Sequence, residues 1–155
     1  MSSGTDQATA RVRELMERNA DAAGVDAGVE IRVDDEGLTA EYVGDDLGLL
    51  IGHHGQTIDA IQHLAYRLAT HGEAERLPVV VDAAGYRERR AHTLRQTAEH
   101  AAQIAVSDRR PVPLEAMSAL ERKVIHEHLK DRRDVETYSE GQEPSRHLVV
   151  APLVD

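Results

Sequence analysis

The sequence predicts an α+β protein built from two small domains, and two patterns along its 155 residues indicate this fold class. Segments with helical apolar spacing and β-branched runs follow the order α-β-β-α-α-β over residues 1–84, then α-β-α-β-β over residues 85–155. A chain of this length can bury one ordinary core or two cores of about 70 to 80 residues each. The short segment 82–85 is therefore the expected domain boundary.

The first half opens with an amphipathic helix, for which Thr5 is a candidate cap. Two alternating apolar runs around an Asp-Asp-Glu-Gly turn then predict a β-hairpin. Asp45 or Asp46 can cap a short helix, and a valine run entered through Pro78 predicts a strand buried on both faces or at a sheet edge. The elements expected in this half are helices over 5–22, 47–51 and 56–70 and strands over 29–33, 38–42 and 77–81.

The second half opens with a long helix rich in arginine and alanine. Pro111 and Pro113 are unsuited to a helix interior and predict a short strand. Ser118 and Glu121 form a capping box, which marks the start of the next helix. The elements expected in this half are helices over 86–107 and 118–131 and strands over 111–114, 135–139 and 147–153.

The composition indicates a globular protein with aliphatic cores, because the chain has no tryptophan or phenylalanine. The absence of cysteine excludes disulfides and thiolate metal sites. Neither a signal peptide nor a run of about 18 apolar residues is present, so we expect a cytoplasmic protein without membrane insertion. The net charge of −10 is uneven: residues 87–133 hold 11 Lys/Arg and 7 Asp/Glu, whereas residues 1–86 hold 6 and 16. The acidic total argues against strong, indiscriminate nucleic-acid binding.

A Gly-x-x-Gly loop, Gly52-His53-His54-Gly55, lies between two helical segments that are anchored by apolar residues on both sides. Glycine allows a tight turn and the close approach of another backbone. The free N–H groups and positive dipole end of the following helix favour an anion. As a bare spacing Gly-x-x-Gly is more often an ordinary turn, and in this context it is a candidate phosphate site.

The helix after Ser118 has two faces at 100° per residue. We expect its apolar side to be buried, with the residues Leu120, Val124, Ile125 and Leu129. The other side carries a basic stripe of Arg122, His126, Lys130 and Arg133. Such a stripe is typical of contacts to a phosphate backbone, and a solvated face balanced by nearby carboxylates is the equally weighted alternative.

These motifs resemble two known domains in a known order. The first half looks like a type II KH domain, with residues 51–57 where that family has its Gly-x-x-Gly loop. The second half resembles the Arg-x-x-x-His domain, written R-3-H here, through Arg122 and His126 and the similar string over residues 135–146. Residues 81–90 look like the junction of these domains in the Jag (KhpB, SpoIIIJ-associated) family, so the resemblance covers nearly the whole chain.

The resemblance implies a bacterial protein that binds single-stranded RNA, with single-stranded DNA left open, and that acts in post-transcriptional regulation without catalysis, cofactor or small-molecule substrate. The loop would clamp the nucleic-acid backbone, and bases would lie in an apolar groove near Ile51, Ile58 and the second strand. Arg122 and His126 would hold phosphates, with Arg146 as a third contact. A small single-KH protein is the implied protein partner.

Two departures from the family pattern qualify this expectation. Such loops usually carry Lys or Arg between the glycines, whereas this loop has two histidines, so we expect weaker contact that strengthens as the pH falls towards 6. Longer members also carry an N-terminal Jag domain, and functions of that domain are not transferred here.

Three other functions are alternatives to RNA binding. A zinc enzyme is disfavoured because the nine histidines include no His-Glu-x-x-His, and His126 and His128 cannot share a helix face. A nuclease is disfavoured because no spaced carboxylate cluster accompanies the stripe. A protein-interaction module that pairs with a KH-type partner and binds little RNA is the more serious alternative.

Overall fold

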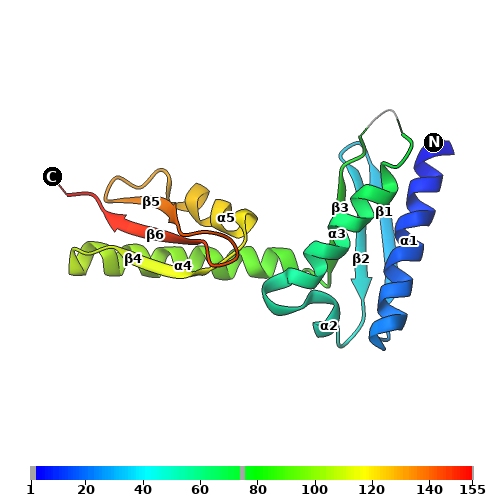
Figure 1. Ribbon diagram of the computed structural model, residues 1–155, viewed down its shortest axis with the longest axis horizontal. Coiled ribbons are helices and arrows are strands. Elements are labelled where there is room, and N and C mark those ends of the chain that lie inside the picture. The colour runs from blue at the N-terminus through cyan, green and yellow to red at the C-terminus, as the bar shows by residue number, and fades with distance from the viewer. Residues whose placement is uncertain (1–2, 74–75, 155) are drawn as a thin grey trace. The chain divides into compact units, whose positions relative to one another are not determined.

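The computed structural model describes residues 3–73 and 76–154 and divides into unit 1, Met1–Arg87, and unit 2, Glu88–Asp155 (Figure 1). The division lies three residues beyond the boundary expected after residue 84. Both element orders are as predicted, so the α+β fold with two small sheets is confirmed. Unit 1 contains α1 (Ser3–Ala23), β1 (Gly28–Asp34), β2 (Gly37–Val43), α2 (Gly48–Ile51), the 3₁₀ turn η1 (His53–Gly55), α3 (Gln56–Ala69) and β3 (Val79–Ala83).

The sheet of unit 1 has the order β1-β2-β3, with β1 antiparallel and β3 parallel to β2. Alternate residues of β2 form the core beneath the helices, and Tyr42 is fully buried there. Its hydroxyl donates a 2.6 Å hydrogen bond to the Met16 carbonyl of α1, and burial raises the pKa of Tyr42 to about 12. This bond ties α1 to the central strand. β3 lies at the sheet edge and Val80 is 43% exposed, so the alternative of a strand buried on both faces is wrong.

Unit 2 packs two helices on a second antiparallel sheet of order β4-β6-β5. The buried side of α4 beyond Leu94 consists of alanines, which lets neighbouring elements approach this helix closely. α4 begins at Tyr86, so its first residues belong to unit 1. The elements are α4 (Tyr86–Asp108), β4 (Val112–Ala116), α5 (Ala119–Leu129), β5 (Val135–Glu140) and β6 (His147–Pro152).

The predicted helix caps were partly correct. The Ser118 hydroxyl accepts a hydrogen bond from the Glu121 amide and caps α5 as expected. Thr5 lies inside α1, which already includes Ser3, so its capping role was wrong. The expected cap by Asp45 or Asp46 was also wrong, because Leu47 is the residue before α2 and no side chain caps that helix. Within the described ranges, no helix combines the length and apolarity needed to cross a membrane.

Candidate nucleic-acid interface

The Gly-x-x-Gly loop adopts a backbone that depends on its glycines. Gly52 has φ 74° and ψ −179°, a conformation open essentially only to glycine. Gly55 has φ 78° and forms the left-handed cap before α3, and His54 between them also has a positive φ of 51°. The loop therefore reverses the chain within one turn and brings it directly into α3.

Neighbouring side chains press closely on both glycines. A Cβ on Gly55 would lie 2.7 Å from Cε1 of the Tyr86 ring and 3.0 Å from its hydroxyl. A Cβ on Gly52 would lie 2.9 Å from the backbone nitrogen of Thr57 and would collide with its side chain. Both positions therefore require glycine, because an added Cβ would clash with neighbouring atoms and because φ is positive at each.

The start of α4 braces this loop from within unit 1. The Arg87 guanidinium donates to Asp59 on the first turn of α3 at 2.7 Å and to the Val81 carbonyl at 2.8 Å. The Gly85 amide donates to Glu41 on β2 at 3.0 Å. Sequence reasoning placed this segment at the domain junction and missed its contact with the loop, because nothing in the local pattern links residues so far apart.

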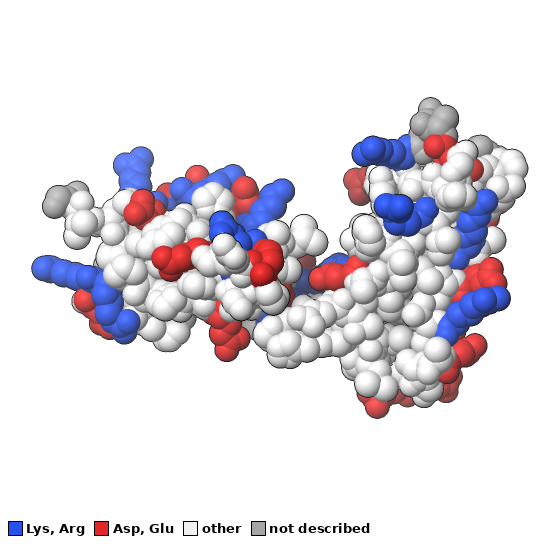
Figure 2. All heavy atoms as spheres, viewed as in Figure 1, with Lys and Arg blue, Asp and Glu red and all other residues white. Residues whose placement is uncertain are grey.

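The two loop histidines form the accessible part of the loop. Their rings stack with centroids 3.9 Å apart, and His53 is exposed while His54 is half-buried. Among the described residues, neither ring makes a hydrogen bond or ion pair, so their N–H groups remain available to an acceptor. Figure 2 shows the surface over α2 and α3 as largely free of charged side chains. Any charge that the loop offers to a phosphate therefore comes mainly from these two imidazoles.

The structure does not form the expected groove beside Ile58 and β2. Ile58 is fully buried in the core, so a groove lined by its side chain was wrong, and Ile51 is partly buried. The packed face of β2 is likewise closed by the helices, because Leu38 and Tyr42 are at most 1% exposed. Apolar surface in unit 1 is provided instead by Leu49, which is 68% exposed, and by side chains on the outer side of α3.

In unit 2 the basic stripe does not form as a continuous row, because Arg122 lies on the buried side of α5. Its side chain is 10% exposed. Arg122 Nη1 donates to the Met117 carbonyl at 2.8 Å and to the Arg146 carbonyl at 3.4 Å, and Nη2 donates to Glu143 at 2.9 Å. The expectation of a solvent-facing Arg122 was wrong. Leu120 was expected to be buried, and this was also wrong, since it is 63% exposed.

His126, one turn after Arg122, is exposed and held from one side. Its Nδ1 shares a 2.6 Å hydrogen bond with the Thr137 hydroxyl on β5. This contact fixes the orientation of the ring, and Nε2 makes no hydrogen bond with the described residues. Sequence reasoning missed Thr137, although the alternation of β5 puts it on the same face as the buried Val135.

The other basic residues of the predicted site differ in whether the protein already supplies an acceptor for their side chains. Lys130 Nζ donates to Glu127 at 2.8 Å, and this contact lowers the pKa of Glu127 and raises that of Lys130. Arg133 is exposed and has no ion pair within the described part of the chain. Arg146 is half-buried, and its guanidinium donates to the Gly141 carbonyl at 2.6 Å. His126, Arg133 and Arg146 therefore have the most capacity left for a phosphate.

Other polar groups of unit 2 are committed to one another. Arg132 donates to Asp134 at 2.6 and 2.8 Å and to Glu99 at 2.7 Å, and Glu99 also contacts His128 at 2.9 Å. The hydrogen bond with Arg132 lowers the pKa of Asp134. Over residues 3–73 and 76–154, no group of three or more His, Asp or Glu residues is arranged to hold a metal ion.

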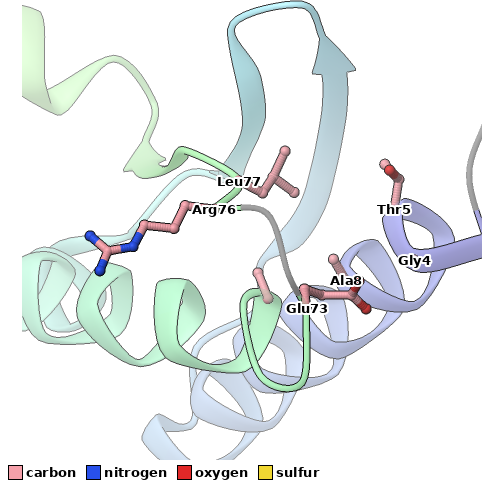
Figure 3. Close-up of a pocket in the computed structure, with 7 residues that line it drawn as sticks. Gly4, Thr5, Ala8, Glu73, Arg76 and Leu77 are labelled. Atoms are coloured by element: carbon pink, nitrogen blue, oxygen red, sulfur yellow. The ribbon is translucent and has the colours of Figure 1, made fainter.

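A small pocket in unit 1 lies between the start of α1 and the end of α3. Figure 3 shows Glu73 close to the α1 residues, while the Arg76 side chain points away from it. Its described lining thus offers a single carboxylate without a converging partner, and we assign it no function.

Comparison with known families matches both halves separately. Residues 10–81 match the family model described as KhpA/KhpB, KH domain, and residues 92–152 match that of the R-3-H domain. The fold and the two matches define the class of protein: a KH domain followed by an R-3-H domain.

Relatives that match most of this chain share one name. RNA-binding protein KhpB of Clostridium symbiosum is 36% identical over 140 residues, which cover 89% of this chain and 63% of the relative. The KhpB proteins of Lactiplantibacillus plantarum and Bacillus subtilis are 41% and 33% identical, over 83% and 79% of this chain and 40% and 61% of their own lengths. The chain belongs to the KhpB (Jag) family, and it spans between 40% and 63% of the length of these three relatives.

Proposed function

We propose that this protein binds single-stranded RNA, with the Gly-x-x-Gly loop of unit 1 as its main contact to the nucleic-acid backbone. The observation that carries the proposal is the geometry of this loop, in which two glycines with positive φ hold a pair of unpaired imidazoles at the start of α3. Free helix N–H groups and imidazole donors suit the oxygen atoms of a phosphodiester. The relatives named as RNA-binding proteins support RNA as the ligand.

Unit 2 contributes a second contact through its exposed basic groups. We assign this role to His126, Arg133 and Arg146. Lys130 can add a fourth contact if its ammonium group leaves Glu127 and binds a phosphate instead. Each of these side chains contacts phosphate and sugar rather than base edges, so this part of the interface adds affinity without sequence preference. The protein is proposed to act in the cytoplasm, in post-transcriptional regulation, as a binding protein rather than an enzyme.

The loop histidines predict that RNA affinity depends on pH. Histidine side chains in general gain a proton between pH 8 and pH 6, and each proton adds one positive charge beside the RNA backbone. Binding of a fluorescent single-stranded RNA should therefore tighten about three- to tenfold from pH 8 to pH 6. Anisotropy titrations at constant ionic strength measure this change.

Two variants separate the loop from the other histidines. Replacing His53 and His54 together by asparagine should flatten most of the pH dependence, whereas His126→Asn should leave most of it in place. An affinity that does not change between pH 8 and pH 6 in the unaltered protein would show that protonation of the imidazoles plays no part in binding.

A second candidate function is association with a small single-KH protein, and the outer side of α3 favours it. Leu64 and Leu68 are 49% and 38% exposed and lie one turn apart on this helix. Exposed leucines at this spacing form an apolar stripe that a partner helix can cover. The name of the matched KH family model, which joins KhpA and KhpB, supports a partner of this type.

Replacing Leu64 and Leu68 together by glutamate should abolish such association while RNA binding by the loop persists within about twofold. Size-exclusion chromatography of the protein mixed with a small single-KH protein measures the first effect, and anisotropy measures the second. Persistent co-elution of the double variant would place the partner elsewhere. Loss of RNA binding in the same variant would show that the α3 side chains belong to the RNA site.

A further inference from the structure

Arg122 is the arginine of the Arg-x-x-x-His motif, and the role assigned to it below rests on the proposed RNA-binding function. We propose that Arg122 is a positioning residue that orders the loop between β5 and β6, residues 141–146, and that it is not itself a phosphate ligand. His126, the other residue of the motif, keeps the direct contact. The two motif residues lie one turn apart on the same side of α5 and thus have separate tasks.

The contacts of Arg122 are directed into the protein. Its guanidinium reaches a carbonyl before α5, a carbonyl at the end of the β5–β6 loop and the carboxylate of Glu143 within that loop. The side chain is 10% exposed, and the carboxylate already neutralises its charge. An RNA phosphate could reach the guanidinium only by displacing Glu143. This displacement is unfavourable, because it breaks hydrogen bonds that stabilise a largely buried charge.

The loop held by Arg122 presents one of the candidate RNA contacts. The Arg146 carbonyl accepts from the Met117 amide at 3.3 Å and from Arg122, and the Ser145 amide closes the turn onto the Gln142 carbonyl at 2.9 Å. The Arg146 side chain is half-buried beside Gly141. Arg122 therefore holds the backbone from which the Arg146 side chain extends, and loss of Arg122 or of its partner Glu143 is expected to loosen this part of the loop.

Glu143→Gln tests this inference because the two roles of Arg122 predict opposite results. If Arg122 positions the loop, loss of the carboxylate loosens residues 141–146 and weakens RNA binding. If Arg122 binds phosphate, loss of the carboxylate frees its guanidinium and tightens RNA binding. Glu136→Gln on β5 is the matched control, since it removes one negative charge from an exposed site of the same unit.

We expect Glu143→Gln to bind single-stranded RNA about three- to tenfold more weakly than Glu136→Gln at the same salt concentration. Amide hydrogen exchange without RNA should be at least about threefold faster at Met117 and Ser145 in Glu143→Gln and unchanged in Glu136→Gln. Arg122→Lys should reproduce the weaker binding, because an ammonium group keeps the charge but cannot make the forked contacts. Its effect should not add to that of Glu143→Gln.

Three results would overturn the inference: RNA binding by Glu143→Gln at least as tight as by Glu136→Gln, unchanged exchange at Met117 and Ser145, or full activity of Arg122→Lys. Absence of RNA binding by the unaltered protein would instead overturn the proposed function. In that case the exchange data still decide whether Arg122 orders the loop, because they are collected without RNA.

Discussion

Replacement of His53 and His54 together by aspartate is expected to weaken single-stranded RNA binding about 100-fold while the fold stays intact. Each aspartate puts a negative charge where a phosphate is proposed to sit, and a like charge at about 4 Å costs roughly 1 kcal/mol in bulk water and several times more near a protein surface. Aspartate tolerates the positive φ of residue 54, so the loop should keep its conformation. Anisotropy titration with labelled RNA measures the loss, and thermal unfolding checks the fold.

The matched control for this variant replaces His63 and His71 by aspartate. Both are exposed residues of unit 1 outside the loop, and the change in net charge is the same. We expect this control to lose at most about threefold in affinity, since exposed charges beyond a Debye length are largely screened. Equal losses in the two variants would mean that the loop has no special place in RNA binding.

The second large effect is expected from Gly55→Ala, which should destabilise unit 1 by about 2–5 kcal/mol. The left-handed conformation at φ 78° accounts for about 1–2 kcal/mol with any non-glycine residue. The new methyl group would also press on the Tyr86 ring, and overpacking of this kind costs typically 1–3 kcal/mol. Chemical denaturation measures the change in the free energy of unfolding.

Gly24→Ala is the control for the backbone term alone. Gly24 has a similar φ of 69°, and an added Cβ would meet nothing within 4 Å, so this variant should lose only about 1–2 kcal/mol. The Gly55→Ala, Tyr86→Leu double variant lacks the aromatic ring that meets the new methyl group. It should therefore recover part of the unfolding free energy that Gly55→Ala loses. A Gly55→Ala variant as stable as Gly24→Ala would contradict the close packing of Tyr86 on the loop.

The order of elements could be predicted from the sequence because hydrophobic periodicity is a local property. The hairpin, the long α3 and α4 helices and the cap at Ser118 all depend on residues a few positions apart. The edge position of β3 was one of two alternatives that the sequence left open, and the choice between them depends on which strand pairs with which.

The faces of α5 were predicted wrongly because Arg122 is charged and Leu120 is apolar, although their angular positions on the helix indicate the opposite burial. At 100° per residue, Arg122 lies about 60° from Ile125, whereas Leu120 lies about 140° away. Periodicity alone therefore favours the buried position that Arg122 occupies and the exposed position of Leu120. A charged residue was expected outside the core, and the partners that allow its burial, Glu143 and the Arg146 carbonyl, come from a distant hairpin.

The contacts that complete the candidate site are equally remote in the sequence. Tyr86 reaches Gly55 and Thr137 reaches His126 only because the fold joins them. The sequence identified the loop glycines and histidines, since their chemistry is contained in four consecutive residues. It did not identify the side chains that hold them in place.

The central claim is that the Gly-x-x-Gly loop and the exposed basic groups of unit 2 contact the same class of ligand, single-stranded RNA. Backbone amide chemical shifts of the isotope-labelled protein, followed by NMR during titration with a single-stranded RNA oligonucleotide at pH 6.5, test this claim most directly. We predict that the largest changes fall on residues 52–57 and on the surroundings of His126, Arg133 and Arg146. Changes confined to the outer side of α3, or an unchanged spectrum at saturating RNA, would contradict it.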